Sequence, residues 1–332
     1  MRLHLIPALT AAFLTIAAAP AAPTYSVASS IPGPDGSWDY ARVDPSAHRL
    51  YVARGDAVTA VDLASDAVTS VGHVQRGHAV MPLADGRLLV TSGTDGTVRF
   101  LNAANGNQIA SVAVGKKPDA AILDEKGDRA FIMNAESGTI SVLDTASMRV
   151  TRTFRAKPGL EYAALAGNTL FVNNEDLNEI EVVDIARGKP GKAIALPGCE
   201  GPTGLGYDAS HARLISACAN GKAAIIDTRT HRLSPLLDIG RGADAVIIDE
   251  GRGLAFIPCG RDGVLDILSL ASSSQVTAAG RVTTEIGART GALDPSTGTI
   301  FLPTARFTAP ALPGGRPTPV PGSFHILVVK PD

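Results

Sequence analysis

Short apolar stretches alternate with polar turns along almost the whole chain, and the same order returns about every 40 residues. Seven copies align on the first polar turn of each, at Asp44, Ala84, Asp124, Ala166, Asp208, Asp249 and Asp294. These anchors lie 40, 40, 42, 42, 41 and 45 residues apart. A period of this length, kept over a whole chain, is typical of a repeat architecture in which each copy is one supersecondary unit.

Each copy predicts four β-strands. A short apolar strand leads into a turn rich in Asp, Pro and Gly, such as DPSAHR from Asp44, and a second strand and a second turn follow. The third strand ends in Asp or Asn in five copies, where the side chain can bond the following turn. Four antiparallel strands per copy indicate a propeller blade. We therefore expect an all-β, seven-bladed β-propeller with four-stranded antiparallel blades and almost no helix.

The last copy predicts how the ring closes. It supplies three strands, interrupted by a long insertion, before Asp332. The segment Tyr25–Ile31 precedes the first copy and has no partner there. We expect this N-terminal strand to be the outer strand of the last blade, which would remove an exposed sheet edge. A ring closed in this way needs no second copy, so a monomer is expected.

The first residues predict an export signal. Arg2 precedes the apolar run Ala8–Ala19, and Ala19 and Ala21 are small residues suited to signal cleavage. The run is too short to span a bilayer, which needs about 20 apolar residues. We expect a secretory signal peptide over 1–21, a single propeller domain over 22–332, and a periplasmic or secreted protein. An uncleaved anchor is the alternative, and no later segment predicts a membrane span.

Composition narrows the class of protein. The chain has 332 residues, of which 45% are hydrophobic, so it can bury a large core. Its 30 Lys and Arg against 32 Asp and Glu give a formal charge of −2, which argues against a nucleic-acid partner. The sequence lacks C-x-x-C-H, so covalent haem is excluded, and it lacks the G-x-S-x-G, P-loop and H-E-x-x-H signatures.

Polar residues recur five positions before the anchors, where the innermost strands should begin. Because blade strands alternate in direction, these positions should ring one mouth of the central channel. They are Asp39, Ala79, Asp119, Glu161, Thr203, Asp244 and Arg289, with His78 beside the alanine. Four acids and an arginine in equivalent positions predict a ligand site for a divalent cation or a small polar molecule. The alternative is that each Asp only caps a turn.

Turns after the second strands should reach the same mouth. They add Asn173, Glu175 and Arg306 to the candidate ligand-binding residues. The segment Thr308–Gly322 belongs to this set and contains five prolines, which favour extended paths. It is either a lid over the channel or a solvated loop.

The three cysteines are Cys199, Cys218 and Cys259. Cys199 comes just before the first strand of the fifth blade and Cys218 ends its second strand, so a disulfide between them is reasonable in an exported protein. Cys259 is left over and is expected to be buried.

Several stretches outside the bare repeat carry a family resemblance. They include GSWDYARVDPSAHRLYVARG from Gly36, NNEDLNEIEVVD from Asn173 and GARTGALDPSTGTIFLPTARF from Gly287. The copies resemble the YVTN-type repeat, and the chain after the leader resembles the YncE-like exported propellers. The resemblance implies seven blades and a binding or scaffold role. The second copy departs from the pattern, because RGHAVMPLADG lacks the expected Asp.

The leading hypothesis is a non-enzymatic binding or protein-interaction module that uses the channel mouth to hold a small polar ligand or a protein partner. A second hypothesis is a metal-dependent lactonase or lyase, in which Asp119 and Glu161 bind a divalent cation and His78 acts as general base. A third is an accessory subunit of a periplasmic redox assembly. These remain alternatives because a fold by itself does not select a function.

Overall fold

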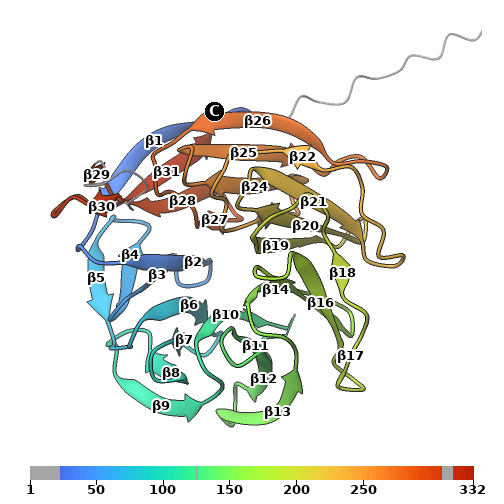
Figure 1. The fold of residues 1–332 in the computed structure, drawn as a ribbon. Helices are drawn as coiled ribbons and strands as arrows, with labels where there is room; N and C mark the ends of the chain where they lie inside the picture. The colour runs from blue at the N-terminus through green and yellow to red at the C-terminus, as the bar shows by residue number, and fades with distance from the viewer. Residues whose placement is uncertain (1–22, 125, 309–316) are drawn as a thin grey trace, which may run out of the picture.

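The computed structural model describes residues 23–124, 126–308 and 317–332, and its main sheets form a ring of seven blades (Figure 1). The expected all-β, seven-bladed propeller is confirmed. The described residues contain no helix, and therefore none that is long and apolar enough to cross a membrane. The predicted signal peptide over 1–21 and residues 309–316 of the proline-rich segment lie outside the described residues.

Each blade starts with a strand next to the ring axis and continues outward to a second strand. From blade 1 to blade 7, the innermost strands are β2 (Trp38–Asp44), β6 (Gly77–Pro82), β10 (Pro118–Leu123), β14 (Leu160–Ala166), β19 (Pro202–Asp208), β23 (Ile247–Asp249) and β27 (Ala292–Asp294). The second strands are β3 (Arg49–Arg54), β7 (Arg87–Ser92), β11 (Arg129–Asn134), β15 (Thr169–Asn174), β20 (Arg213–Cys218), β24 (Leu254–Cys259) and β28 (Thr299–Thr304).

The two outer positions complete each antiparallel blade. The third strands are β4 (Val58–Asp62), β8 (Thr97–Asn102), β12 (Thr139–Asp144), β16 (Glu179–Asp184), β21 (Lys222–Asp227), β25 (Val264–Ser269) and β31 (His325–Pro331). The outer strands are β5 (Val68–Val71), β9 (Gln108–Ala113), β13 (Arg149–Arg155), β17 (Lys189–Pro190) with β18 (Ile194–Ala195), β22 (Leu237–Asp238), β26 (Thr277–Thr283) and β1 (Tyr25–Pro32). In blade 4 the outer strand is therefore split into two short pieces that both pair with β16.

Blade 7 is built from both ends of the described chain, as the sequence predicts. β1 pairs antiparallel with β31, with Tyr25 opposite Pro331 and Ile31 opposite Ile326. The backbone N–H of Asp332 donates to the carbonyl of Thr24 at 2.9 Å. A short hairpin of β29 (Phe307–Thr308) and β30 (Thr318–Pro319) stands beside this blade.

The hydrophobic core lies between the blades. The second and third strands are buried on both faces, because each blade is packed between two neighbours. Their largest side chains are fully buried, among them Tyr51, Phe100, Phe131, Phe171 and Phe256. The buried clusters combine residues of adjacent blades, as where Tyr25 of β1 meets Phe256 of blade 6 with 4.9 Å between ring centroids. Each large buried side chain contributes roughly 1.5–3 kcal/mol of hydrophobic stabilisation.

The Asp and Asn residues that end third strands cap the turns that follow, as expected. Each side-chain oxygen accepts a hydrogen bond from a backbone N–H two or three residues later. The capping residues are Asp62, Asn102, Asp144, Asp184 and Asp227.

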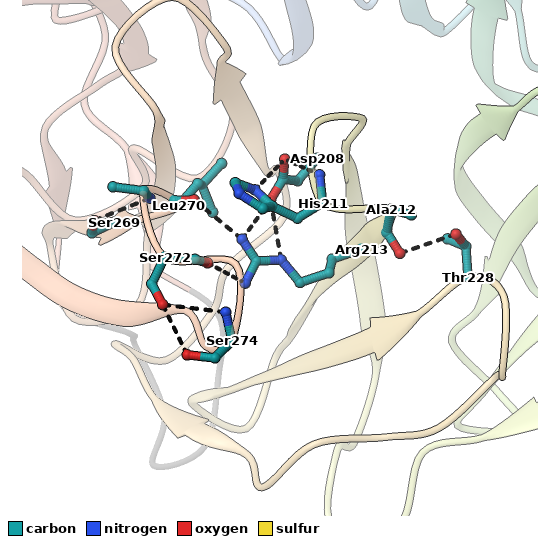
Figure 2. A network of polar contacts seen from close by, with 10 residues as sticks. Asp208, His211, Ala212, Arg213, Thr228, Ser269, Leu270, Ser272 and Ser274 are labelled. Carbon is teal, nitrogen blue, oxygen red and sulfur yellow. Dashed lines mark hydrogen bonds and ion pairs between the residues drawn. The ribbon is translucent and has the colours of Figure 1, made fainter.

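A buried ionic network joins blade 5 to blade 6 (Figure 2). The Arg213 guanidinium donates two hydrogen bonds to Asp208, at 3.1 and 2.7 Å, and His211 contacts the same carboxylate. The guanidinium also donates to the carbonyls of Leu270 and Ser272, which follow β25 in blade 6. Asp208 and Arg213 are buried. Every nitrogen of this guanidinium therefore has an acceptor.

Blade 5 also carries the one disulfide among the described residues. It joins Cys199 to Cys218, with 5.4 Å between their Cα atoms. Cys259 is free and buried, and its sulfur lies 3.6 Å from a carboxylate oxygen of Asp266. Burial and the Asp266 charge raise the pKa of this thiol, so it stays protonated.

Candidate functional site

Five innermost strands carry a β-bulge near their first residues. The pairing register shifts in β2, β6, β10, β14 and β19, in each case within three residues of the strand start. A bulge interrupts the regular alternation and turns a side chain in a new direction. The residues at these bulges include five of the predicted site residues, namely Asp39, His78, Asp119, Glu161 and Thr203.

Charged side chains gather at one end of the channel, and four of them lie at these bulges. We call this group the mouth cluster; it consists of Asp39, His78, Lys117, Asp119, Glu161, Asp244 and Arg289. The structure thus brings together six of the predicted ligand-binding residues. It adds Lys117, which sequence analysis missed. Extending the repeat register two residues upstream of Asp119, to the stretch GKKPD, would have found it.

His78 bridges two carboxylates from neighbouring blades. Its Nδ1 lies 2.7 Å from Asp39 and 2.8 Å from Asp119. Burial alone would lower the pKa of His78, but the hydrogen bonds and charges of Asp119 and Asp39 outweigh burial and raise it to about 9. Both imidazole nitrogens are therefore protonated at neutral pH, and the ring is positively charged. Its Nε2 is buried and has no hydrogen-bond partner among the described residues.

Asp119 is held as a carboxylate from two sides. Burial opposes ionisation, but the hydrogen bond and charge of His78 and the Lys117 ammonium, 2.9 Å away, lower the pKa of Asp119. The same contact raises the pKa of Lys117 against the effect of burial. Asp119 is therefore a fixed negative charge.

Glu161 is the exception in the mouth cluster. It is 8% exposed, and its carboxyl group has no hydrogen-bond or ion-pair partner among the described residues. Burial, then the charges of Asp119, Asp244 and Glu175, raise the pKa of Glu161 well above its ordinary value, while Lys117 opposes this shift. Glu161 therefore holds its proton where an ordinary glutamate would be ionised.

Asp244 and Arg289, which precede the innermost strands of blades 6 and 7, form an ion pair with 2.7 Å between Nε and Oδ2. Burial raises the pKa of Asp244; Arg289 opposes the shift and Asp39 adds to it, so that it reaches about 6. Burial lowers the pKa of Arg289, but Asp244 and Asp39 overcome this and raise it. The pair is ionised at neutral pH.

Two tyrosines form the floor of the mouth. The Tyr40 ring of blade 1 packs on the Tyr162 ring of blade 4, with 4.8 Å between centroids. The Tyr40 hydroxyl donates to the carbonyl of Asp244 in blade 6 at 3.3 Å. Burial and the mouth carboxylates raise the pKa of Tyr40 well above 10, so it stays neutral. The two rings meet across the channel, since blades 1 and 4 are not adjacent.

The other predicted site residues take different places. Thr203 is buried and donates to the carbonyl of Ala243. Asn173 donates to the carbonyls of Thr203 and Gly204 and accepts from Ser216, which joins blade 4 to blade 5.

Two of the predicted residues lie outside the mouth cluster itself. Glu175 lies near enough to Glu161 to affect its pKa. Arg306 is exposed beside the β29–β30 hairpin, and its backbone N–H donates to Ser323.

Three mouth residues offer the donor types of a metal site. One oxygen each from Asp39 and Asp119 and one nitrogen of His78 all lie within 4.8 Å of one another. Carboxylate oxygens and imidazole nitrogen suit a divalent transition metal. The Nδ1 atom of His78 already contacts both carboxylates, so an ion bound to this nitrogen would have to replace its proton. Glu161, expected to share an ion with Asp119, is not part of this group.

Comparison with known proteins gives the fold. No family model matches the sequence, and no curated protein sequence matches it either. A chain of hydrazine synthase from Kuenenia stuttgartiensis is 17% identical, with a TM-score of 0.68, covering 82% of this chain and 92% of its own. A chain of the mitotic checkpoint complex is 14% identical, with a TM-score of 0.71, covering 99% and 98%. At such identities the likeness is one of fold alone: the chain is a seven-bladed β-propeller.

Proposed function

We propose that the protein is an exported, YncE-like propeller that binds a small cationic ligand at the mouth cluster without converting it chemically. The observation that carries the proposal is the position of Glu161. Glu161 is a largely buried residue whose carboxyl group has no hydrogen-bond or ion-pair partner among the described residues and lies near other acids, so a ligand that brings a positive charge to it would be favoured.

The charge balance of the mouth supports a cation. The four acids of the mouth cluster, Asp39, Asp119, Glu161 and Asp244, outnumber its three basic groups, His78, Lys117 and Arg289, so ionisation of Glu161 would leave one negative charge uncompensated. A divalent metal ion or an alkyl diammonium would stabilise the ionised form of Glu161 and release its proton. The rigid ring of strand ends suits recognition, because it holds the donors in place before the ligand arrives.

The test is calorimetric titration of the mature protein with MgCl₂, CaCl₂, ZnCl₂ and 1,4-diaminobutane. We expect one site for at least one probe, weakened roughly 10-fold or more in Glu161→Gln. Titration in two buffers of different ionisation enthalpy should show proton release that Glu161→Gln abolishes. Asp85→Asn is the control, because Asp85 is an exposed acid paired with Arg87 away from the mouth. Failure of all four probes to bind the unaltered protein would contradict the proposal.

A metal-dependent lactonase or lyase is the second candidate, supported by the three clustered donors Asp39, His78 and Asp119. In that case the ion would polarise a carbonyl group. Metal-loaded protein that opens lactones, with activity lost in His78→Gln, would replace the binding proposal. A redox accessory subunit is the third reading; co-purification with a haem or quinone protein would favour it.

Export is part of the proposal and has its own test. The leader sequence supports it, and a disulfide such as Cys199–Cys218 persists in oxidising compartments. Cell fractionation should find the protein outside the cytoplasm with Ala22 as its first residue. A cytoplasmic protein that retains residues 1–21 would contradict export.

A further inference from the structure

Beyond the Tyr40–Tyr162 floor the channel continues as a cavity of about 560 Å³. Its lining includes Pro45 and Pro295, which follow innermost strands, so it opens on the face opposite the mouth cluster. No residue of the mouth cluster lines it. This volume lies within the range of small-molecule sites.

Aliphatic side chains form part of the wall of this lower cavity. Five consecutive blades each contribute one large aliphatic side chain from the innermost strand. These side chains are Ile122, Leu165, Leu205, Ile248 and Leu293. Such a lining holds a hydrocarbon body by excluding water from it.

One cation lines this cavity. Arg42 of β2 is partly buried and reaches across the channel, where it donates to the Tyr162 hydroxyl. No carboxylate of the described residues lies within ion-pair distance of Arg42, in contrast to Arg213. Burial lowers the pKa of Arg42, which reflects this lack of compensation.

The acids of the cavity lining do not neutralise Arg42. Asp124 is paired with Arg129, 2.9 Å away, and Glu250 is exposed. Arg42 therefore presents a positive charge, without an ion-pair partner among the described residues, to a cavity whose wall includes the five aliphatic side chains. The ligand that best stabilises such a charge has one group of opposite charge and is otherwise apolar, because burial of further polar groups would cost free energy.

We propose that the lower cavity binds a small monocarboxylate with an apolar body. The carboxylate of this ligand forms an ion pair with Arg42 and accepts a hydrogen bond from the Tyr162 hydroxyl. Its hydrocarbon part packs against the five aliphatic side chains. Because Arg42 is the one basic residue among the described residues of the lining, the cavity should select one negative charge and disfavour dianions and cations. This site is separate from the mouth cluster and goes beyond the function proposed there.

The test is calorimetric titration with octanoate, 1-octanol and octylammonium, which share one hydrocarbon chain and differ in charge. We expect octanoate to bind one site and 1-octanol and octylammonium to bind weakly or not at all. Arg42→Met should weaken octanoate roughly 10- to 100-fold, because a hydrogen-bonded charge pair is lost. Arg155→Met, which alters an exposed arginine on the outer strand β13, should bind octanoate normally.

Three results would overturn the proposal: no binding of octanoate to the unaltered protein, equal binding by Arg42→Met, or 1-octanol binding as tightly as octanoate. Circular dichroism checks that Arg42→Met is folded, and Arg42→Gln replaces it if it is not. Asp119→Asn should leave octanoate binding unchanged. The proposal for the lower cavity can therefore fail or succeed independently of the proposal for the mouth cluster.

Discussion

Arg213 and Arg42 place guanidinium groups in two very different regions. Arg213, between blades 5 and 6, donates to Asp208 and to two backbone carbonyls, so all its nitrogens are satisfied (Figure 2). Arg42, in the lower cavity, donates to the Tyr162 hydroxyl and has no carboxylate partner among the described residues. The two arginines differ in their partners: all nitrogens of the Arg213 guanidinium are bonded within the protein, whereas Arg42 lacks a counter-charge among the described residues, which a ligand could supply. The partners of a buried or partly buried charge therefore say more about its role than its burial does.

The largest effect is expected from removing the satisfied arginine. Arg213→Met leaves the buried Asp208 carboxylate without its main partner, so we expect a loss of about 3–5 kcal/mol in the free energy of unfolding. Urea denaturation measures it. Arg187→Met is the matched control, because Arg187 is exposed and its pair with Asp184 should contribute less than about 1 kcal/mol. If Arg213→Met and Arg187→Met lowered the free energy of unfolding equally, the buried ion pair would be no more important for stability than an exposed one.

The disulfide in the same blade is expected to rank next. Cys199 and Cys218 are 19 residues apart, and closing a loop of that length restricts the unfolded chain. We expect Cys199→Ala with Cys218→Ala to lower the free energy of unfolding by about 3 kcal/mol. A reducing agent should have the same effect on the unaltered protein and none on the double variant. Stability unaffected by reduction would show that the bridge is absent or unimportant.

His78 is a buried cation whose partners are Asp39 and Asp119, so its contribution to the free energy of unfolding should depend on pH. Its pKa in the folded protein, about 9, lies above its ordinary value of 6.5. The stabilisation is therefore complete below pH 6.5 and is lost as pH rises through 9, on the order of 3 kcal/mol in total. The difference in unfolding free energy between the unaltered protein and His78→Gln should shrink over this range. A difference that is constant with pH would contradict the bridging role.

The smallest change in stability is expected at Arg42. Arg42→Met removes a charge that has no counter-charge among the described residues, so the free energy of unfolding should change by less than about 1 kcal/mol and towards greater stability. Thermal unfolding without added ligand measures it. A loss like that of Arg213→Met would show that Arg42 has a structural partner.

The fold could be predicted from the sequence because its signals are local and repeat. The turn-capping residues from Asp62 to Asp227 and the place of Tyr25–Ile31 in the last blade follow from the repeat register. The mouth positions follow from the same register. His78, instead of Ala79, carries the site chemistry of blade 2, and the β-bulge in β6 accompanies this choice.

Arg42 could not be singled out from the sequence. It occupies an ordinary alternating position in β2, and its importance depends on Tyr162, 120 residues away, and on the lack of a carboxylate near it among the described residues. The same holds for the floor, since the Tyr40–Tyr162 contact joins blades that are not adjacent. The repeat pattern predicts which strands pair within a blade, but it does not predict which side chains meet across the channel.

The seam of blade 7 also sets how the ring responds to tension. Tyr25 lies opposite Pro331, so the two ends of the described chain emerge side by side from the same end of the β1–β31 pair. A pull on both ends would act along the hydrogen bonds between these antiparallel strands, which run perpendicular to the strand direction. The bonds would then break one after another from Tyr25 towards Pro32. A ring pulled by the two ends of the described chain would therefore open first at blade 7, between β1 and β31.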